Sequence, residues 1–74
     1  MLVNHMSRNL FNATIIPEVI QQIETNYHLS ESEALRFFYH SDTARALNDP
    51  ETGLYGQSAL FIFSVFLQEN PLPA

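Results

Sequence analysis

Cysteine, lysine and tryptophan are absent from this chain of 74 residues, and glycine occurs only twice. Without cysteine, the chain can form no disulfide, no thiolate nucleophile and no cysteine-ligated metal cluster. A domain of this size buries only about 60% of the surface that its unfolded chain exposes, so its core alone provides little stability. The missing crosslink therefore favours association with a second chain.

Basic residues are scarce as well. The chain has eight acidic residues against three basic ones, Arg8, Arg36 and Arg45, which gives a formal net charge of −5. Nucleic-acid binding needs clustered cations to neutralise phosphates, and docking on anionic membranes needs the same. We therefore expect no nucleic-acid partner and no membrane partner. A basic protein partner fits the charge, although acidity also serves ordinary solubility.

The chain lacks a long hydrophobic run. Its most apolar stretch, Ala59 to Leu67, spans nine residues, whereas a membrane helix takes roughly 20. The opening residues MLVNHMSRNLF lack the basic start and continuous apolar core of a signal peptide. The sequence therefore predicts a protein of the cytoplasm of a prokaryotic-type cell, and it leaves open whether Met1 or Met6 is the natural start.

The first clear helical periodicity begins after residue 12. Pro17 suits the first position of a helix, where its missing N–H costs nothing. Apolar residues recur at spacings of three and four, which is typical of one buried helical stripe: Ile16, Ile20, Ile23 and Tyr27. We expect this helix to end at Asn26 or His28, and residues 1–12 to form a flexible tail or a short helical turn.

Capping residues predict two further helices. Ser30 and Glu33 match a capping box, in which each side chain bonds the backbone N–H of the other residue. The inward stripe of this second helix is predicted to be Ala34, Leu35 and Phe38. Ser41 or Asp42 can cap a short third helix, which Asp49-Pro50 ends because a residue before proline avoids helical geometry.

A final helix is predicted from Gln57 or Ser58 to about Glu69. Its core-facing residues are predicted to be Ala59, Ile62, Phe63 and Phe66. No segment shows the period-two alternation of a strand convincingly. The predicted fold class is therefore all-α, a small compact bundle of three main helices plus one short helix. One domain would cover residues 13–70, with a C-terminal tail over residues 71–74.

The segment DPETGLYGQSAL, residues 49–60, holds both glycines. They match no phosphate-binding pattern, and no lysine follows them to contact a phosphate. We interpret the segment as a corner, with Gly53 at positive φ, Leu54 and Tyr55 anchored on the core, and a second bend at Gly56. The sequence allows two interpretations of Tyr55: its ring belongs to the core, or it borders a binding surface.

No set of residues predicts a catalytic or metal site. His5, His28 and His40 are far apart, and none is paired with another ligand at helical spacing. His40-Ser41-Asp42 has the residue types of a hydrolytic triad, but adjacent side chains diverge and serve better as a helix end and cap. We therefore expect no enzyme activity, no cofactor, no metal and no small-molecule substrate.

The last helix is apolar over more of its circumference than packing on one side explains. Either the other helices surround it, or part of its surface meets another chain. The candidate partner-binding residues lie on its flanks and in the preceding corner: Leu54, Tyr55, Leu60, Phe61, Val65 and Leu67. They predict a non-enzymatic protein-protein interaction module. A homodimer without a heterologous target is the alternative, and the charge disfavours a helix-turn-helix DNA-binding regulator.

Two segments, SESEALRFFYHSDT and DPETGLYGQSALFIF, carry a family resemblance. From Ile15 to Phe66, the chain resembles a group of short, uncharacterised bacterial proteins with an LSExEALxxFYxSxT…DxETGLYGxS pattern. Where that pattern has a bulkier residue such as tyrosine, this chain has Ala44-Arg45-Ala46. Related proteins are often encoded beside toxin-like, ADP-ribosyltransferase-like proteins. The resemblance implies a compact helical protein without established enzyme activity, and an antitoxin-like or accessory role.

Overall fold

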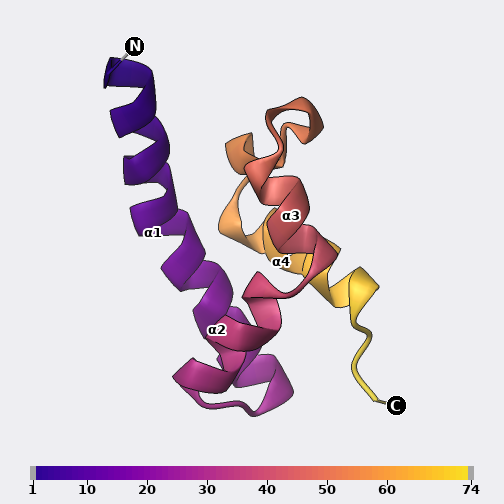
Figure 1. The fold of residues 1–74 in the computed structure, drawn as a ribbon. Coiled ribbons are helices and arrows are strands. Elements are labelled where there is room, and N and C mark those ends of the chain that lie inside the picture. The colour runs from indigo at the N-terminus through magenta and orange to yellow at the C-terminus, as the bar shows by residue number, and fades with distance from the viewer. Residues whose placement is uncertain (1, 74) are drawn as a thin grey trace.

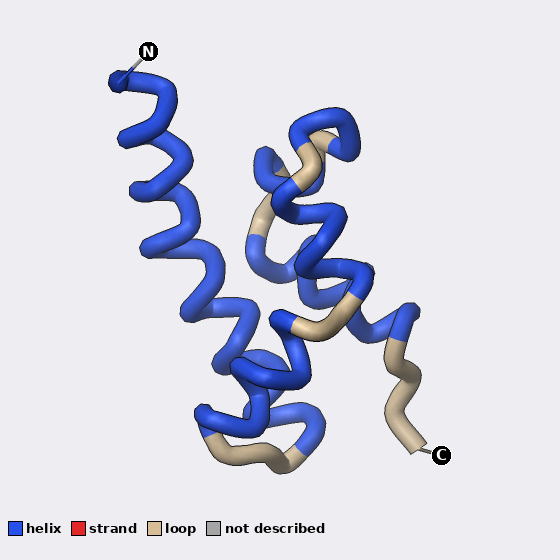
Figure 2. The backbone as a smooth tube through the Cα atoms, in the orientation of Figure 1, coloured by secondary structure: helices blue, strands red, loops and turns tan. Residues whose placement is uncertain are grey.

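The computed structural model describes the backbone of residues 2–73 and the side chains of residues 15–73, and it is helical almost throughout (Figures 1 and 2). Its α-helices are α1 (Leu2–Tyr27), α2 (Glu31–Tyr39), α3 (Asp42–Asn48) and α4 (Ala59–Glu69). Two short 3-10 helices, η1 (Pro50–Thr52) and η2 (Leu54–Gly56), join α3 to α4. No strand occurs within residues 2–73, so the predicted all-α fold with three main helices and one short helix is confirmed.

Helix α1 begins earlier than the sequence predicts. It starts at Leu2, and Pro17 lies inside it rather than at its first position. An interior proline removes one N–H from the ladder of helical hydrogen bonds, and its ring crowds the carbonyl four residues earlier, so the long helix continues through it at a cost. The expected tail or short turn over residues 1–12 is therefore helical backbone from Leu2 onward, while Met1 and the side chains before Ile15 lie outside the described part.

The C-terminal end of α1 is closed by a left-handed residue. Helix α1 ends at Tyr27, and His28 follows with φ 56°. The N–H of Leu29 then donates to the carbonyl oxygen of Glu24 at 3.1 Å. This pairing across the helix end satisfies a carbonyl that would otherwise lack a partner.

Serine caps start α2 and α3 as predicted. The Ser30 hydroxyl accepts from the Glu33 N–H at 3.2 Å, and the Glu33 carboxylate accepts from the Ser30 N–H at 2.9 Å. Ser41 caps α3 by accepting from the Ala44 N–H at 3.1 Å. Both helices therefore begin where their local sequence directs, because each cap satisfies orphan N–H groups within one turn.

The core lies where α1, α2, α3 and α4 meet. Its largest fully buried side chains are Phe38, Phe66, Ile23, Ile62, Val19 and Thr43. Phe66 of α4 is the aromatic centre, with ring centroids 4.8 Å from Phe37 and 5.7 Å from Tyr27. These edge-on contacts suit the charge distribution of aromatic rings and add to the stability gained from burial.

The prediction that Leu35 belongs to the inward stripe of α2 is wrong. Ala34 and Phe38 are fully buried, but the Leu35 side chain is 36% exposed. Phe37, which is not part of the predicted stripe, packs against Tyr27 and Phe66. The position of α1 and α4 relative to α2 decides which flank is covered, and helical periodicity within α2 does not contain that information.

Candidate protein-interaction surface

The corner between α3 and α4 is held by short-range hydrogen bonds. Asp49 starts η1 by accepting from the Glu51 N–H at 3.0 Å. The Thr52 hydroxyl donates to the Ala46 carbonyl at 2.6 Å and accepts from the Leu54 N–H at 3.1 Å. Gly53 has φ 68°, as predicted, and a left-handed conformation of this kind favours glycine. The corner is therefore a defined turn rather than a loose loop.

Helix α4 begins directly after this corner. The Ser58 hydroxyl caps it by accepting from the Phe61 N–H at 3.1 Å. Its buried residues are Ala59, Ile62, Phe63 and Phe66, which confirms the predicted core face. The opposite face is stiffened near its start, where the Ser64 hydroxyl donates to the Phe61 carbonyl at 2.6 Å.

The first turn of α4 places two large apolar side chains in solvent. Leu60 is 67% exposed and Phe61 is 48% exposed. Both sit on a capped helix whose other face is fixed in the core, so their positions are set before any partner arrives. Pre-positioned apolar side chains of this size are the kind of residue that anchors protein interfaces. We call this pair the α4 anchor.

The other predicted partner-binding residues are less accessible. Val65 and Leu67 are partly buried and pack against the core. Tyr55 is also partly buried against the core. Leu54 is 7% exposed and forms part of the core, as predicted for the corner, so it offers a partner little surface. Its place at the start of η2, directly after the turn at Gly53, directs the side chain inward.

Among the large hydrophobic side chains of residues 15–73, three exposed ones lie outside the predicted set. Leu35, Tyr39 and Leu72 are 36%, 58% and 40% exposed. Tyr39 lies at the side of the apolar stripe of α2, so the sequence contains a signal from which its exposure could have been predicted. Leu72 follows α4 in a segment without helix or strand, and no periodicity exists there to predict its exposure.

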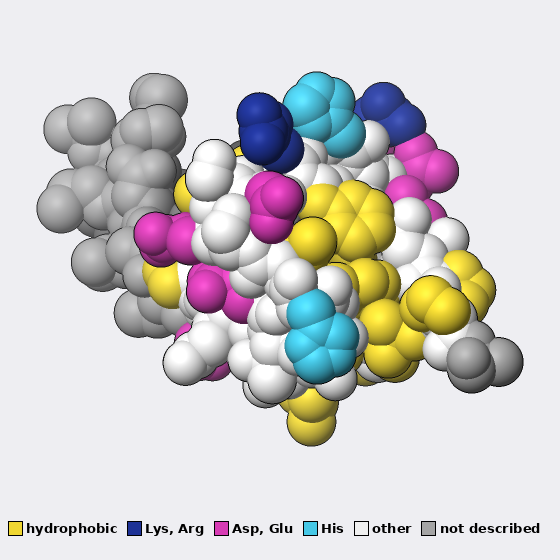
Figure 3. All heavy atoms as spheres, turned by 90° about the horizontal axis from the view of Figure 1, so that it is seen from below, with side chains coloured by type: hydrophobic (Ala, Val, Ile, Leu, Met, Phe, Trp, Pro, Cys, Tyr) yellow, Lys and Arg dark blue, Asp and Glu magenta, His cyan; other side chains and the backbone are white. Residues whose placement is uncertain are grey.

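A hollow of about 500 Å³ lies between the end of α1, the start of α2 and the segment after α4. Tyr27, Leu29, Phe37 and Leu72 form its apolar walls, and Figure 3 shows hydrophobic side chains gathered on the lower face of the molecule. Two of its polar groups are already engaged: the Tyr27 hydroxyl donates to the Asn70 carbonyl at 2.6 Å, and Glu33 serves the capping box. The hollow therefore offers apolar contact more than polar chemistry.

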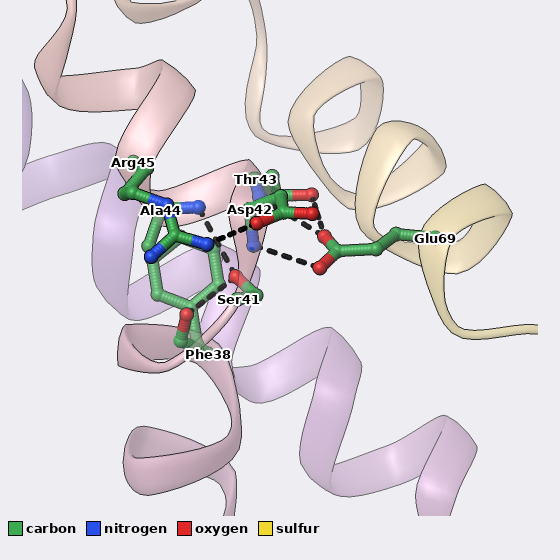
Figure 4. Close-up of polar contacts among 7 residues, drawn as sticks. All are labelled: Phe38, Ser41, Asp42, Thr43, Ala44, Arg45 and Glu69. Atoms are coloured by element: carbon green, nitrogen blue, oxygen red, sulfur yellow. Dashed lines mark hydrogen bonds and ion pairs between the residues drawn. The ribbon is translucent and has the colours of Figure 1, made fainter.

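The polar cluster at the start of α3 has structural duties (Figure 4). The buried Ser41 hydroxyl donates to the Phe38 carbonyl at 2.5 Å while it caps α3. The Nδ1 of His40 donates to the Arg36 carbonyl at 2.8 Å, and Asp42 pairs with Arg45. Within residues 15–73, no buried side-chain nitrogen or oxygen lacks a partner. The predicted role of His40-Ser41-Asp42 as a helix end and cap is confirmed.

Glu69, the last residue of α4, supplies a second cap to α3. Its carboxylate accepts from the N–H groups of Asp42 and Thr43 at 2.7 and 3.0 Å (Figure 4). Loss of solvation where the carboxylate meets α3 acts to raise the pKa of Glu69, but hydrogen bonds from the Thr43 hydroxyl and these N–H groups outweigh it and lower the pKa. A carboxylate held ionised at a helix N-terminus stabilises the fold and is poorly suited to donate a proton.

The described residues contain no group of three or more histidine, cysteine or acidic side chains that could hold a metal ion. The side chain of His5 lies outside the described part. Among the helices of residues 2–73, none combines the length and the apolar character needed to cross a membrane. Comparison of the chain with known protein families, curated proteins and solved structures found no match.

Proposed function

We propose that this protein is a non-enzymatic protein-interaction module that binds a partner protein through the α4 anchor and the corner before it. The observation that carries the proposal is the exposure of Leu60 and Phe61, 67% and 48%, at consecutive positions in the first turn of a capped helix. Exposed apolar surface on such a small domain costs solubility, and removal of that surface from water is a gain that a partner provides.

The charge of the chain agrees with a protein partner. The formal net charge is −5, and of the two arginines with described side chains, Arg45 is paired with Asp42. Little positive charge is therefore left for phosphates, which disfavours the helix-turn-helix alternative. The family resemblance supports a narrower role, in which the protein is an antitoxin-like or accessory subunit that covers part of a partner.

A pull-down from the native host tests the proposal. The Leu60→Gln/Phe61→Gln variant keeps the net charge and removes the apolar anchor, so we expect it to lose the partner that the unaltered chain recovers. The matched control is Leu72→Gln, which changes an exposed apolar residue outside both α4 and the helices before it. Equal recovery by a folded Leu60→Gln/Phe61→Gln variant would exclude the α4 anchor as the binding surface.

Light scattering separates the homodimer alternative from a heterologous target. A chain that dimerises, and whose Leu60→Gln/Phe61→Gln variant is monomeric, uses the anchor for a second copy. A monomeric chain that recovers a partner supports the proposed module. Co-expression with the product of the adjacent gene addresses the antitoxin-like role, because a stable complex that requires Leu60 and Phe61 is the expected outcome.

A further inference from the structure

A second apolar surface lies between α1, α2 and α3, away from the α4 anchor. It consists of two hollows of about 150 and 200 Å³ that share Ile16 and Pro17 and therefore adjoin each other. The smaller hollow is completed by Ile20, Glu24, Glu31 and Leu35. The larger one is completed by Phe38, Tyr39, Ala44, Leu47 and Asn48. We call the two together the α1–α2 groove.

Apolar side chains line both sides of the α1–α2 groove, together with some polar ones. Leu35 and Tyr39 lie four residues apart on α2, which places them on one face of that helix, and they are 36% and 58% exposed. Pro17 is exposed on α1 and lines both hollows. Residues such as Phe38 and Leu47 are buried beneath them and form the floor. The groove therefore combines a packed floor with exposed apolar rims.

One end of the groove is acidic. Glu24 of α1 and Glu31 of α2 both line the smaller hollow, and the one ion pair among the described residues is Arg45–Asp42. Arg36, the described cation on α2, lines neither hollow and acts on Glu33, whose pKa it helps to lower after the larger effect of the Ser30 hydrogen bonds. The two carboxylates at the groove end are thus free to meet a cation from another chain.

We propose that the α1–α2 groove binds an amphipathic helix of a partner protein, with two large apolar side chains one turn apart and a lysine or arginine at one end. A hollow of about 150 Å³ is the size of an engineered cavity that takes up benzene, so each hollow accommodates one large apolar side chain. Apolar anchors at helical spacing in a groove are a recurring mode of peptide recognition. The cation of the partner helix lies beside Glu24 and Glu31, which sets its direction in the groove.

A synthetic peptide titration tests this proposal on the full chain. The probe is a helical peptide of about 15 residues, near the length at which isolated helices become marginal, with two leucines one turn apart and lysines at one end. We expect it to shift the backbone amide NMR signals of residues that line the groove, and to leave those around Leu60 and Phe61 unchanged. A control peptide with glutamate in place of each lysine should bind much more weakly.

Two variants separate the apolar and the charged contributions. Leu35→Gln/Tyr39→Gln should weaken peptide binding about tenfold or more, as the loss of interface anchors does. Glu24→Gln/Glu31→Gln should weaken it several-fold and flatten its dependence on salt. Leu60→Gln/Phe61→Gln should bind the peptide as the unaltered chain does. The proposal about the groove and that about the α4 anchor can therefore fail independently.

Several results would overturn the proposal. The first is that the signals of groove residues do not shift when the lysine peptide reaches millimolar concentration. The second is that the glutamate peptide binds as tightly as the lysine peptide. The third is that a folded Leu35→Gln/Tyr39→Gln variant binds the lysine peptide with full affinity. Self-association of the chain that this same variant abolishes would assign the groove to a second copy instead. If the variant does not fold, signal mapping on the unaltered chain decides the question without it.

Discussion

The Glu69 carboxylate accepts a 2.7 Å hydrogen bond from the Thr43 hydroxyl, so the last residue of α4 is tied to the first turn of α3. Twenty-six positions of sequence separate the two residues. The contact closes the bundle after the corner at Gly53 and Leu54 has reversed the chain. It holds the C-terminal end of α4 against the start of α3.

Removal of this cap should destabilise the protein. Glu69→Ala leaves the N–H groups of Asp42 and Thr43 without their carboxylate, and we expect a loss of about 1 kcal/mol in the free energy of unfolding. Urea denaturation followed by circular dichroism measures it. Glu18→Ala, at an exposed position of α1, is the control and should change stability far less. Equal effects of the two substitutions would show that the Glu69 cap contributes nothing of its own.

Acid should weaken the fold through Glu33 and Glu69. Hydrogen bonds from the Ser30 N–H and hydroxyl lower the pKa of Glu33, and the pKa of Glu69 is also lowered. A carboxyl with a depressed folded-state pKa stabilises the protein above its unfolded pKa, about 4.3, and this stabilisation is lost as the pH falls through the folded value. We therefore expect the urea midpoint to be steady near neutral pH and to fall below about pH 4.3.

Substitution of both groups checks the cause of that acid dependence. A Glu33→Gln/Glu69→Gln variant should be less stable at neutral pH and should lose less stability on acidification than the unaltered chain. An unchanged acid slope would assign the effect to other carboxylates.

The two glycines should respond differently to alanine. Gly53 has φ 68°, whereas Gly56 has no left-handed φ and open space where a Cβ would lie. We expect Gly53→Ala to destabilise the protein by about 1 kcal/mol. Gly56→Ala should stabilise it by up to about 0.5 kcal/mol, since it restricts the unfolded chain. Thermal unfolding of both variants measures the contrast, and a common sign of effect would contradict it.

Alanine substitutions of Leu54 and Leu60 should distinguish a core residue from a residue of the interaction surface. Leu54 is 7% exposed and Leu60 is 67% exposed. Leu54→Ala should cost about 2–3 kcal/mol of stability because it opens a cavity, while Leu60→Ala should cost less than about 0.5 kcal/mol. Denaturant unfolding gives the stabilities. If the two substitutions cost the same, Leu60 belongs to the packed core and is no anchor for a partner.

The parts of the fold that depend on short stretches of chain were predictable from sequence. The structure contains the caps Ser30, Ser41 and Ser58, the turn at Gly53 and the predicted core face of α4. Each rests on interactions within about four residues or on the 3.6-residue period of the helix. The start of α1 was not predictable in this way, because a proline is favoured at a first helical position yet tolerated inside a long helix.

The candidate surfaces were likewise predictable from sequence only in part. Leu60 and Phe61 were predicted from the apolar excess of α4, since a helix with apolar residues on most sides cannot bury all of them in a small bundle. In contrast, two features depend on how the helices pack: the exposure of Leu35, and the meeting of Pro17 with Tyr39 in one groove.

Helix type, caps and the inward face of α4 thus follow from the order of residues alone, because their physical causes are local. Three features arise only after folding: the exposed flank of α2, the Glu69 cap on α3, and the groove beside Glu24 and Glu31. Each requires side chains from separate helices to meet. Their meeting depends on packing across the whole bundle, and no local pattern in the sequence records it.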